Sequence, residues 1–367
     1  MGTTGRRSLF TELRAGLGQA LAQFRIPDPR QKSASSGAAD SSLEIPLRPE
    51  WLISDLEFPI PDWRLVGEWI EAQSPEQHNA LWTAVARRWA THLAKAFGGC
   101  NVFETANILA VLPGDIGRGK RAVRHYEETL HTLRSALGDM ALPSWYGKFL
   151  LLIAPDRDLY YRYHSAYCAP GEHIASGGVY LNRGYGHIVI PSPDSMFATR
   201  VIAHELCHAL LVHHTLPLWL NEGVTQITEA AVAGRPLTDH STKFADHRAF
   251  WTPANIGNFW DGRSFDIPGD VSALSYDLAY LVVGAFLRLD RKAMATVVMQ
   301  AKPDDSSFAA FSAAYGQTPA DLLAEMFGPG DWGNGHRTTP VRSADGETTG
   351  ELPNVIGKRE GRRLPLP

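Results

Sequence analysis

The chain is poor in cysteine, with three thiols at positions 100, 168 and 207 among its 367 residues. No two of them have the short spacing of a metal-binding or redox pair, which argues against a disulfide framework and slightly favours a reducing compartment. Long apolar runs are also lacking, and no stretch reaches the length that we expect of a membrane-spanning helix. Strong net charge is absent too: the formal charge of −4 predicts no nucleic-acid partner.

The composition is that of an ordinary globular protein, with 44% hydrophobic and 20% charged residues. Near the N-terminus, Arg6 and Arg7 precede an apolar stretch, but Glu12 and Arg14 interrupt it. We therefore expect no signal peptide and a cytoplasmic location. Apolar residues recur at helical spacing from Phe10 to Phe24, which predicts either a weakly packed terminal helix or an amphipathic segment for weak docking.

Composition divides the chain into four regions. Residues 1–48 form a flexible N-terminal segment, 49–98 a helical segment, 99–330 the main domain, and 331–367 a tail that we expect to be disordered because it is rich in Gly, Pro, Thr and charge.

Apolar periodicity predicts an α+β fold: a small mixed sheet followed by a mainly helical C-terminal half. One helix begins with a capping box at Ser74 and ends near Gly98 and Gly99, and another covers 118–137. Strands are expected over 105–112, 148–154, 158–164, 178–181 and 186–191, which are β-rich or apolar runs bounded by Gly, Pro and Asp.

One motif carries more chemistry than the rest of the chain. His204, Glu205 and His208 stand as His-Glu-Leu-Cys-His within a helix expected over 196–212. Imidazoles four residues apart lie about 40° apart around a helix and about 6 Å apart along it, so both can reach one ion. Glu205 lies about 100° from His204, where its carboxylate can act as a general base. Cys207 points away from the pair and reads as an inert buried thiol.

A catalytic zinc normally has three protein ligands, and two residues compete for the third place. His214 has the spacing of a metzincin ligand, but Leu211 replaces the required turn-forming Gly. Glu222 follows Pro217, which can end the first helix and open a second. If the first helix runs six residues past His208, an antiparallel second helix returns Glu222 to the level of the metal, so we favour Glu222.

The run Ile202–His208 followed by Pro-Leu-Trp-Leu-Asn-Glu-Gly over 217–223 resembles the gluzincin zinc metallopeptidases, especially their bacterial peptidase-MA-like branch. The likeness extends over about 105–327. Thr225 departs from it, because many relatives carry Ala or Ser there. The resemblance implies a zincin-like fold with an active-site helix, and a Zn²⁺ ion held by His204, His208 and Glu222.

The resemblance also implies hydrolysis of peptide bonds in a peptide or protein substrate, with Glu205 as base. Tyr276, in Ser-Tyr-Asp-Leu-Ala-Tyr, is the candidate donor to the oxyanion, and a packed structural tyrosine is the alternative. His240 and His247 are weaker rivals. The strand at 186–191 would then be the sheet edge that a substrate joins. The other function that stays open is a zinc-containing binding or regulatory module without turnover.

Overall fold

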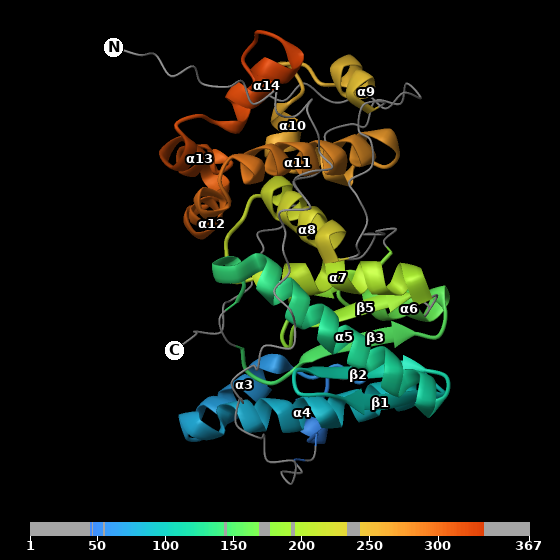
Figure 1. The fold of residues 1–367 in the computed structure, drawn as a ribbon. Helices are drawn as coiled ribbons and strands as arrows, with labels where there is room; N and C mark the ends of the chain where they lie inside the picture. Colours follow the sequence, from blue (N-terminus) through green and yellow to red (C-terminus); the bar gives the residue numbers. More distant parts are fainter. Residues whose placement is uncertain are drawn as a thin grey trace. The chain divides into compact units, whose positions relative to one another are not determined.

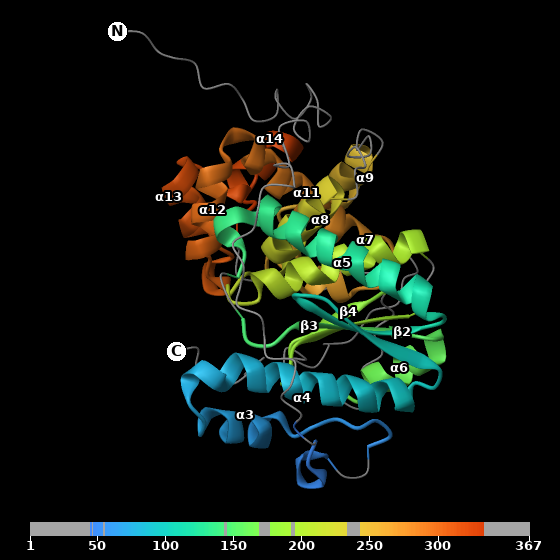
Figure 2. The same ribbon diagram turned by 60° about the horizontal axis from the view of Figure 1, so that its bottom comes forward.

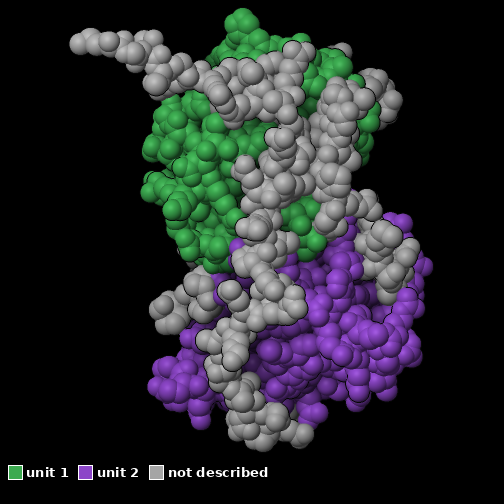
Figure 3. Space-filling model, viewed as in Figure 1, with its two compact units in different colours: residues 1–25, 136–141, 211–358 green, residues 26–135, 142–210, 359–367 purple. Residues whose placement is uncertain are grey.

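The computed structural model describes residues 45, 47–53, 56–142, 145–168, 177–191, 195–232 and 243–333. The chain divides into two compact units, coloured separately in Figure 3. The described residues from 45 to 135 and from 142 to 210 form the sheet unit, and 136–141 with 211–333 form the helical unit. The segment from Phe10 to Phe24 and the tail beyond 333 lie outside the described residues, so the predictions for them stay predictions.

A five-stranded mixed sheet forms the centre of the sheet unit (Figure 1). Its strands lie in the order β1-β2-β3-β5-β4, with β2, β3 and β5 parallel and an antiparallel strand at each edge. In chain order they are β1 (Cys100–Glu104), β2 (Ile108–Pro113), β3 (Phe149–Ala154), β4 (Val179–Leu181) and β5 (His187–Pro191). The three parallel strands are apolar at nearly every position because helices cover both faces of the sheet.

Each face has its own helices (Figures 1 and 2). On one face α4 (Pro75–Ala96) contacts β1 and β2, and α6 (Arg157–Ser165) contacts β3 and β5. Helix α3 (Trp63–Glu71) packs on α4, and the 3₁₀ turn η1 (Pro49–Trp51) packs on α3. On the other face lie α5 (Ile116–Leu137) and α7 (Ser195–Leu211). Aromatic rings fill the α4 side: Trp89 lies 4.7 Å from Trp63 and 5.0 Å from His187, between ring centroids.

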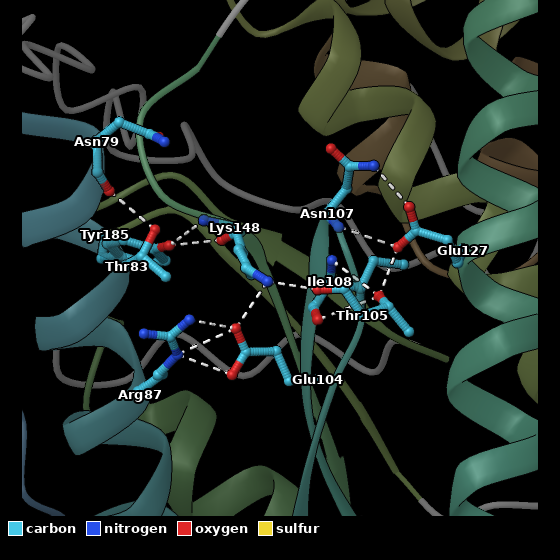
Figure 4. A network of polar contacts seen from close by, with 10 residues as sticks. All are labelled: Asn79, Thr83, Arg87, Glu104, Thr105, Asn107, Ile108, Glu127, Lys148 and Tyr185. Carbon is cyan, nitrogen blue, oxygen red and sulfur yellow. Dashed lines mark hydrogen bonds and ion pairs between the residues drawn. The ribbon is translucent and has the colours of Figure 1, made fainter. Parts of the chain in front are cut away.

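Polar contacts fix the β1–β2 hairpin to the helices on both sides (Figure 4). Glu127 of α5 accepts hydrogen bonds from the Asn107 amide nitrogen at 3.1 Å and from Asn107 Nδ2 at 2.6 Å. On the other side, Glu104 binds the guanidinium of Arg87 from α4 at 2.7 Å and Lys148 Nζ at 2.7 Å. The turn between the two strands therefore has a defined position, which hydrophobic periodicity alone would not give it.

The helical unit is built around two helices that pack side by side, α8 (Leu218–Val232) and α11 (Asp270–Leu289). A Cβ on Gly223 of α8 would lie 2.6 Å from the carbonyl oxygen of Ala279 on α11, so only glycine allows this close crossing. The other elements are η2 (Gly138–Met140), α9 (Lys243–Phe250), α10 (Gly257–Trp260), η3 (Arg263–Asp266), α12 (Arg291–Gln300), η4 (Pro303–Asp305), α13 (Phe308–Tyr315) and α14 (Pro319–Phe327).

Helix α11 is long and apolar enough to span a membrane, so the expectation that no stretch reaches that length is wrong for it by length and composition. Within its most apolar window, 67% of the residues are buried inside the protein. A helix at the centre of a helical unit needs apolar residues all round, and this burial is that of a core helix.

The α+β class, the small mixed sheet and the helical C-terminal half are confirmed, but three local predictions are wrong. Residues 158–164 form helix α6 rather than a strand, because Asp156 caps its start by accepting the Leu159 amide at 2.8 Å. Strand β5 is not an edge strand, because β4 pairs with its outer side and is itself the edge. Ser74 precedes α4 as expected, but its side chain makes no capping hydrogen bond.

Candidate metal centre

Helix α7 presents two half-buried imidazoles on an otherwise buried surface. Seven of its apolar residues have relative exposures of 0 to 1%, whereas Val201 is half-buried. They are Ile202, Ala203, Leu206, Cys207, Ala209, Leu210 and Leu211. His204 and His208 are intermediate in exposure, and Glu205 is buried at 7%. The helix is therefore apolar over most of its described surface, as expected, and the two histidines are half-buried within it.

The two histidine side chains turn toward each other. Their Nε2 atoms lie 3.1 Å apart, and the ring centroids are 4.7 Å apart with an interplanar angle of 81°. Two nitrogens bound to one tetrahedral zinc at about 2.0 to 2.1 Å lie about 3.3 Å from each other. The observed separation fits a shared ion closely, and it also fits a hydrogen bond between the two rings.

Glu222 of α8 completes a group of three ligand atoms. One ligand atom each from His204, His208 and Glu222 all lie within 4.8 Å of one another. Glu222 is 6% exposed, and a carboxylate at that depth requires a charged or hydrogen-bonding partner. The first helix ends at Leu211, three residues past His208 rather than the six expected, and α8 begins directly after Pro217. The geometric route to Glu222 was thus wrong in the length of the first helix.

His214 does not belong to this group of ligand atoms. It lies after the end of α7, and its Nε2 is 2.9 Å from the carbonyl oxygen of Met140. Desolvation by burial lowers the pKa of this imidazole, so it is neutral near pH 7 and its Nε2–H donates to the carbonyl. The interaction gives His214 a structural partner.

Tyr276 is half-buried on α11, and it lies in a helix as predicted. Its ring packs edge to face on Phe265 with centroids 5.1 Å apart. Its backbone carbonyl accepts a hydrogen bond of 2.8 Å from Gln226 Nε2 of α8. The sequence did not single out Gln226, which stands four residues after Glu222 on the same side of α8.

The rival histidines have other fates. His247 of α9 is fully buried; Trp251 Nε1 donates to its Nδ1 at 3.1 Å, and its Nε2 donates to Asp277 Oδ2 at 2.8 Å. An indole N–H can only donate, so Nδ1 is the acceptor of this pair. Both ring nitrogens of His247 are used, which removes it as an oxyanion donor. His240 lies outside the described residues.

No protein-family model matches the chain, and no curated protein matches it. The case for a function therefore rests on the motif and on the geometry of its residues.

Proposed function

We propose that the protein is a zinc-dependent metallopeptidase with a zincin-like fold and a gluzincin-type ligand set. His204, His208 and Glu222 hold the metal, Glu205 is the general base, and a peptide or protein is the substrate. The observation that carries the proposal is the approach of three ligand atoms, from two imidazoles and one carboxylate, to within 4.8 Å of one another.

The donor set suits zinc better than its common competitors. Two imidazoles and one carboxylate form the mixed nitrogen and oxygen set of a catalytic zinc site, whereas calcium and magnesium prefer oxygen ligands throughout. Three protein ligands leave one position open in a tetrahedron, as catalysis requires and a purely structural site does not. The partial exposure of His204 and His208 agrees with an open position.

The residues around the ligands have distinct tasks. Zinc bound there supplies Lewis acidity toward water and toward the scissile carbonyl. Glu205 accepts a proton from the attacking water and delivers it to the leaving amine, which is why the motif needs a carboxylate directly after the first histidine. Tyr276 donates its phenolic hydrogen to the oxyanion that develops on the carbonyl oxygen.

The binding-module alternative uses the same ligands and differs at Glu205. A site that only holds zinc has no use for a general base beside the metal. The retention of Glu205 at 7% exposure therefore favours turnover.

Zinc content of purified variants tests the ligand assignment. His204→Ala, His208→Ala and Glu222→Gln should each lower bound zinc from about one ion per chain to well below it, because a site with two remaining ligands binds weakly. The measurement is metal analysis after exhaustive dialysis, together with the melting temperature to confirm folding.

Two variants serve as matched controls. His214→Ala removes an imidazole bound to Met140, and Glu229→Gln neutralises a second buried carboxylate on α8. Both should keep zinc. Loss of zinc from His214→Ala with retention in Glu222→Gln would contradict the ligand set.

A further inference from the structure

The sheet has a second antiparallel edge, strand β1. Along this strand the backbone N–H and C=O groups of alternate residues bond to β2, and those of the residues between them point outward. The Thr105 amide donates to the Ile108 carbonyl at 2.9 Å, so Thr105 and Ile108, which lie opposite each other, form a hydrogen-bonded pair. Since such pairs alternate along an antiparallel ladder, Phe103 and Asn101 also bond to β2. The backbone N–H and C=O groups of Val102 and Glu104 therefore point away from the sheet.

Val102 adds an exposed apolar side chain to this edge. It is 37% exposed, which is high for a valine in a strand. Exposed edges with free backbone groups are templates for another strand, and many proteins protect them with proline, bulges or a covering element. Within the described part of the chain, strand β1 has no proline, no bulge and no further strand beyond it over Cys100–Glu104.

Helices border the edge on both sides, as Figure 4 shows for the neighbouring end of the hairpin. On one side the ion pair between Glu104 and Arg87 holds β1 against α4. On the other, Phe103 packs directly on α5, since a Cβ on Gly119 would lie 2.1 Å from its ring. The flanking surface of β1 is thus made by the last turns of α4 and the first turns of α5.

These turns carry basic side chains, which we call the basic border. All five members are exposed, and none forms an ion pair within the described part of the chain. They are Arg88 and Lys95 on α4, and Arg118, Lys120 and Arg121 on α5. Lys95 lies seven residues, about two turns, after Arg88 on the same side of α4, and Arg118 and Lys120 adjoin Gly119. The carboxylate nearest the α5 members in the chain, Asp115, accepts the Arg118 amide at 2.8 Å, and this bond, helped by the charges of Arg121 and Arg118, lowers the pKa of Asp115.

We propose that β1 is a docking edge for an extended acidic segment of a partner protein, which adds to the sheet as a sixth strand between the two halves of the basic border. Backbone pairing with Val102 and Glu104 supplies the register and acidic side chains meet the cations on either side. A chain with a net charge of −4 repels acidic partners in general, so the local cations give this edge its selectivity. This edge is opposite β4 in the sheet, and the proposal does not depend on peptidase activity.

Binding of three labelled eight-residue peptides, followed by fluorescence anisotropy, tests both parts of the proposal. One peptide alternates Glu and Val, the second alternates Lys and Val, and the third alternates Glu and Pro. The Glu–Val peptide should bind, and the other two should bind at least about tenfold more weakly, because one has the wrong charge and one cannot pair as a strand. Absence of Glu–Val binding, or equal binding of Glu–Pro, overturns the proposal.

Variants of the protein locate the site. Val102→Pro removes an outward N–H that β2 does not use, so the fold should persist while peptide affinity falls about tenfold or more. Val102→Thr keeps that N–H and should bind as the parent does. Arg118→Glu combined with Lys120→Glu should weaken Glu–Val binding by a similar factor. Unchanged affinity in either the Val102→Pro or the double variant contradicts the assignment.

Hydrogen exchange gives a readout that needs no variant, and it decides the matter if Val102→Pro fails to fold. The amides of Val102 and Glu104 should exchange fast in the free protein and slow down when the Glu–Val peptide is added. The amide of Phe103 should be protected in both states. Slowing that is absent from Val102 and Glu104 would overturn the proposal.

Discussion

Histidines with different neighbours illustrate how contacts at the residue scale decide chemistry. His187 donates from Nδ1 to the Tyr185 carbonyl at 2.8 Å and accepts from the Tyr163 hydroxyl at 2.9 Å. His247 is likewise satisfied at both nitrogens. His204 and His208 instead direct Nε2 atoms at each other, an arrangement that a metal ion between them would use fully. We propose the metal-binding role for the pair whose ring nitrogens converge.

Tyr276→Phe separates a catalytic from a structural tyrosine. If the hydroxyl donates to the developing oxyanion, the turnover rate should fall by about 10² to 10³, while zinc content and melting temperature stay nearly unchanged. Peptide-hydrolysis kinetics and thermal melting of this variant provide the test. An unchanged rate with a melting temperature lowered by the loss of about 1 kcal/mol would assign Tyr276 to packing.

His187 should make stability depend on pH. Burial lowers its pKa from 6.5 to about 4 in the folded protein, so between these values the unfolded chain binds the extra proton. The stability contribution is full above pH 6.5 and is lost as the pH falls toward 4, by about 3 kcal/mol in total. Melting temperatures from pH 4 to 7 should fall less steeply in His187→Gln than in the parent. The exposed His131→Gln variant is the control and should keep the slope of the parent. Equal slopes of melting temperature against pH in His187→Gln and in the parent would contradict this prediction.

At the scale of elements, the sequence predicts best where one physical signal dominates. Helices α5 and α7 and strands β3, β4 and β5 match the expected ranges within two residues, because the strands are short apolar or β-rich runs, α7 is apolar over most of its surface and α5 has one apolar face. Strand β1 was missed: it is short, polar at several positions, and held by Arg87 and by Phe103 packing on Gly119, contacts that have no local pattern. Helix α6 was misread because its tyrosines favour strands, whereas the Asp156 cap and buried Tyr160 and Tyr163 favour a helix.

The proposed metal ligands could likewise be predicted from the sequence only in part. The i, i+4 spacing gives His204 and His208 directly, since the helix fixes both. Glu222 depends on where α7 ends and α8 begins, and α7 ends three residues earlier than expected. Gln226 bonding to Tyr276 could not be predicted, because its partner is fifty residues away in the chain.

The crossing of α8 and α11 should be sensitive to one methyl group. Gly223→Ala places a Cβ 2.5 Å from Val283 and 2.6 Å from the Ala279 carbonyl, so the helices must separate, at a cost of about 1 to 3 kcal/mol. Chemical denaturation measures this loss. Gly284→Ala is the matched control on α11, where the nearest atom is 3.5 Å away. It should be neutral or gain up to about 1 kcal/mol. Equal effects of the two would mean that the crossing is looser than described.

At the scale of the whole molecule, this mainly helical chain with one small sheet carries imidazole and carboxylate side chains on α7 and α8 among buried apolar residues. The apolar shell of α7 contains two imidazoles and a carboxylate, and α8 contributes Glu222. Buried polar groups of this kind lower stability unless they are paired or bind a ligand, so zinc should also stabilise the folded protein. That stabilisation alone would fit a binding module as well as a peptidase.

Hydrolysis of a mixed peptide library by the zinc-loaded parent and by Glu205→Gln tests the central claim most directly. The variant keeps the shape and hydrogen-bonding reach of the side chain but cannot accept a proton. We predict that both proteins hold about one zinc per chain and that turnover falls by about two orders of magnitude or more in the variant. A zinc-loaded parent that cleaves no peptide, or a Glu205→Gln variant that cleaves as fast as the parent, would contradict the account.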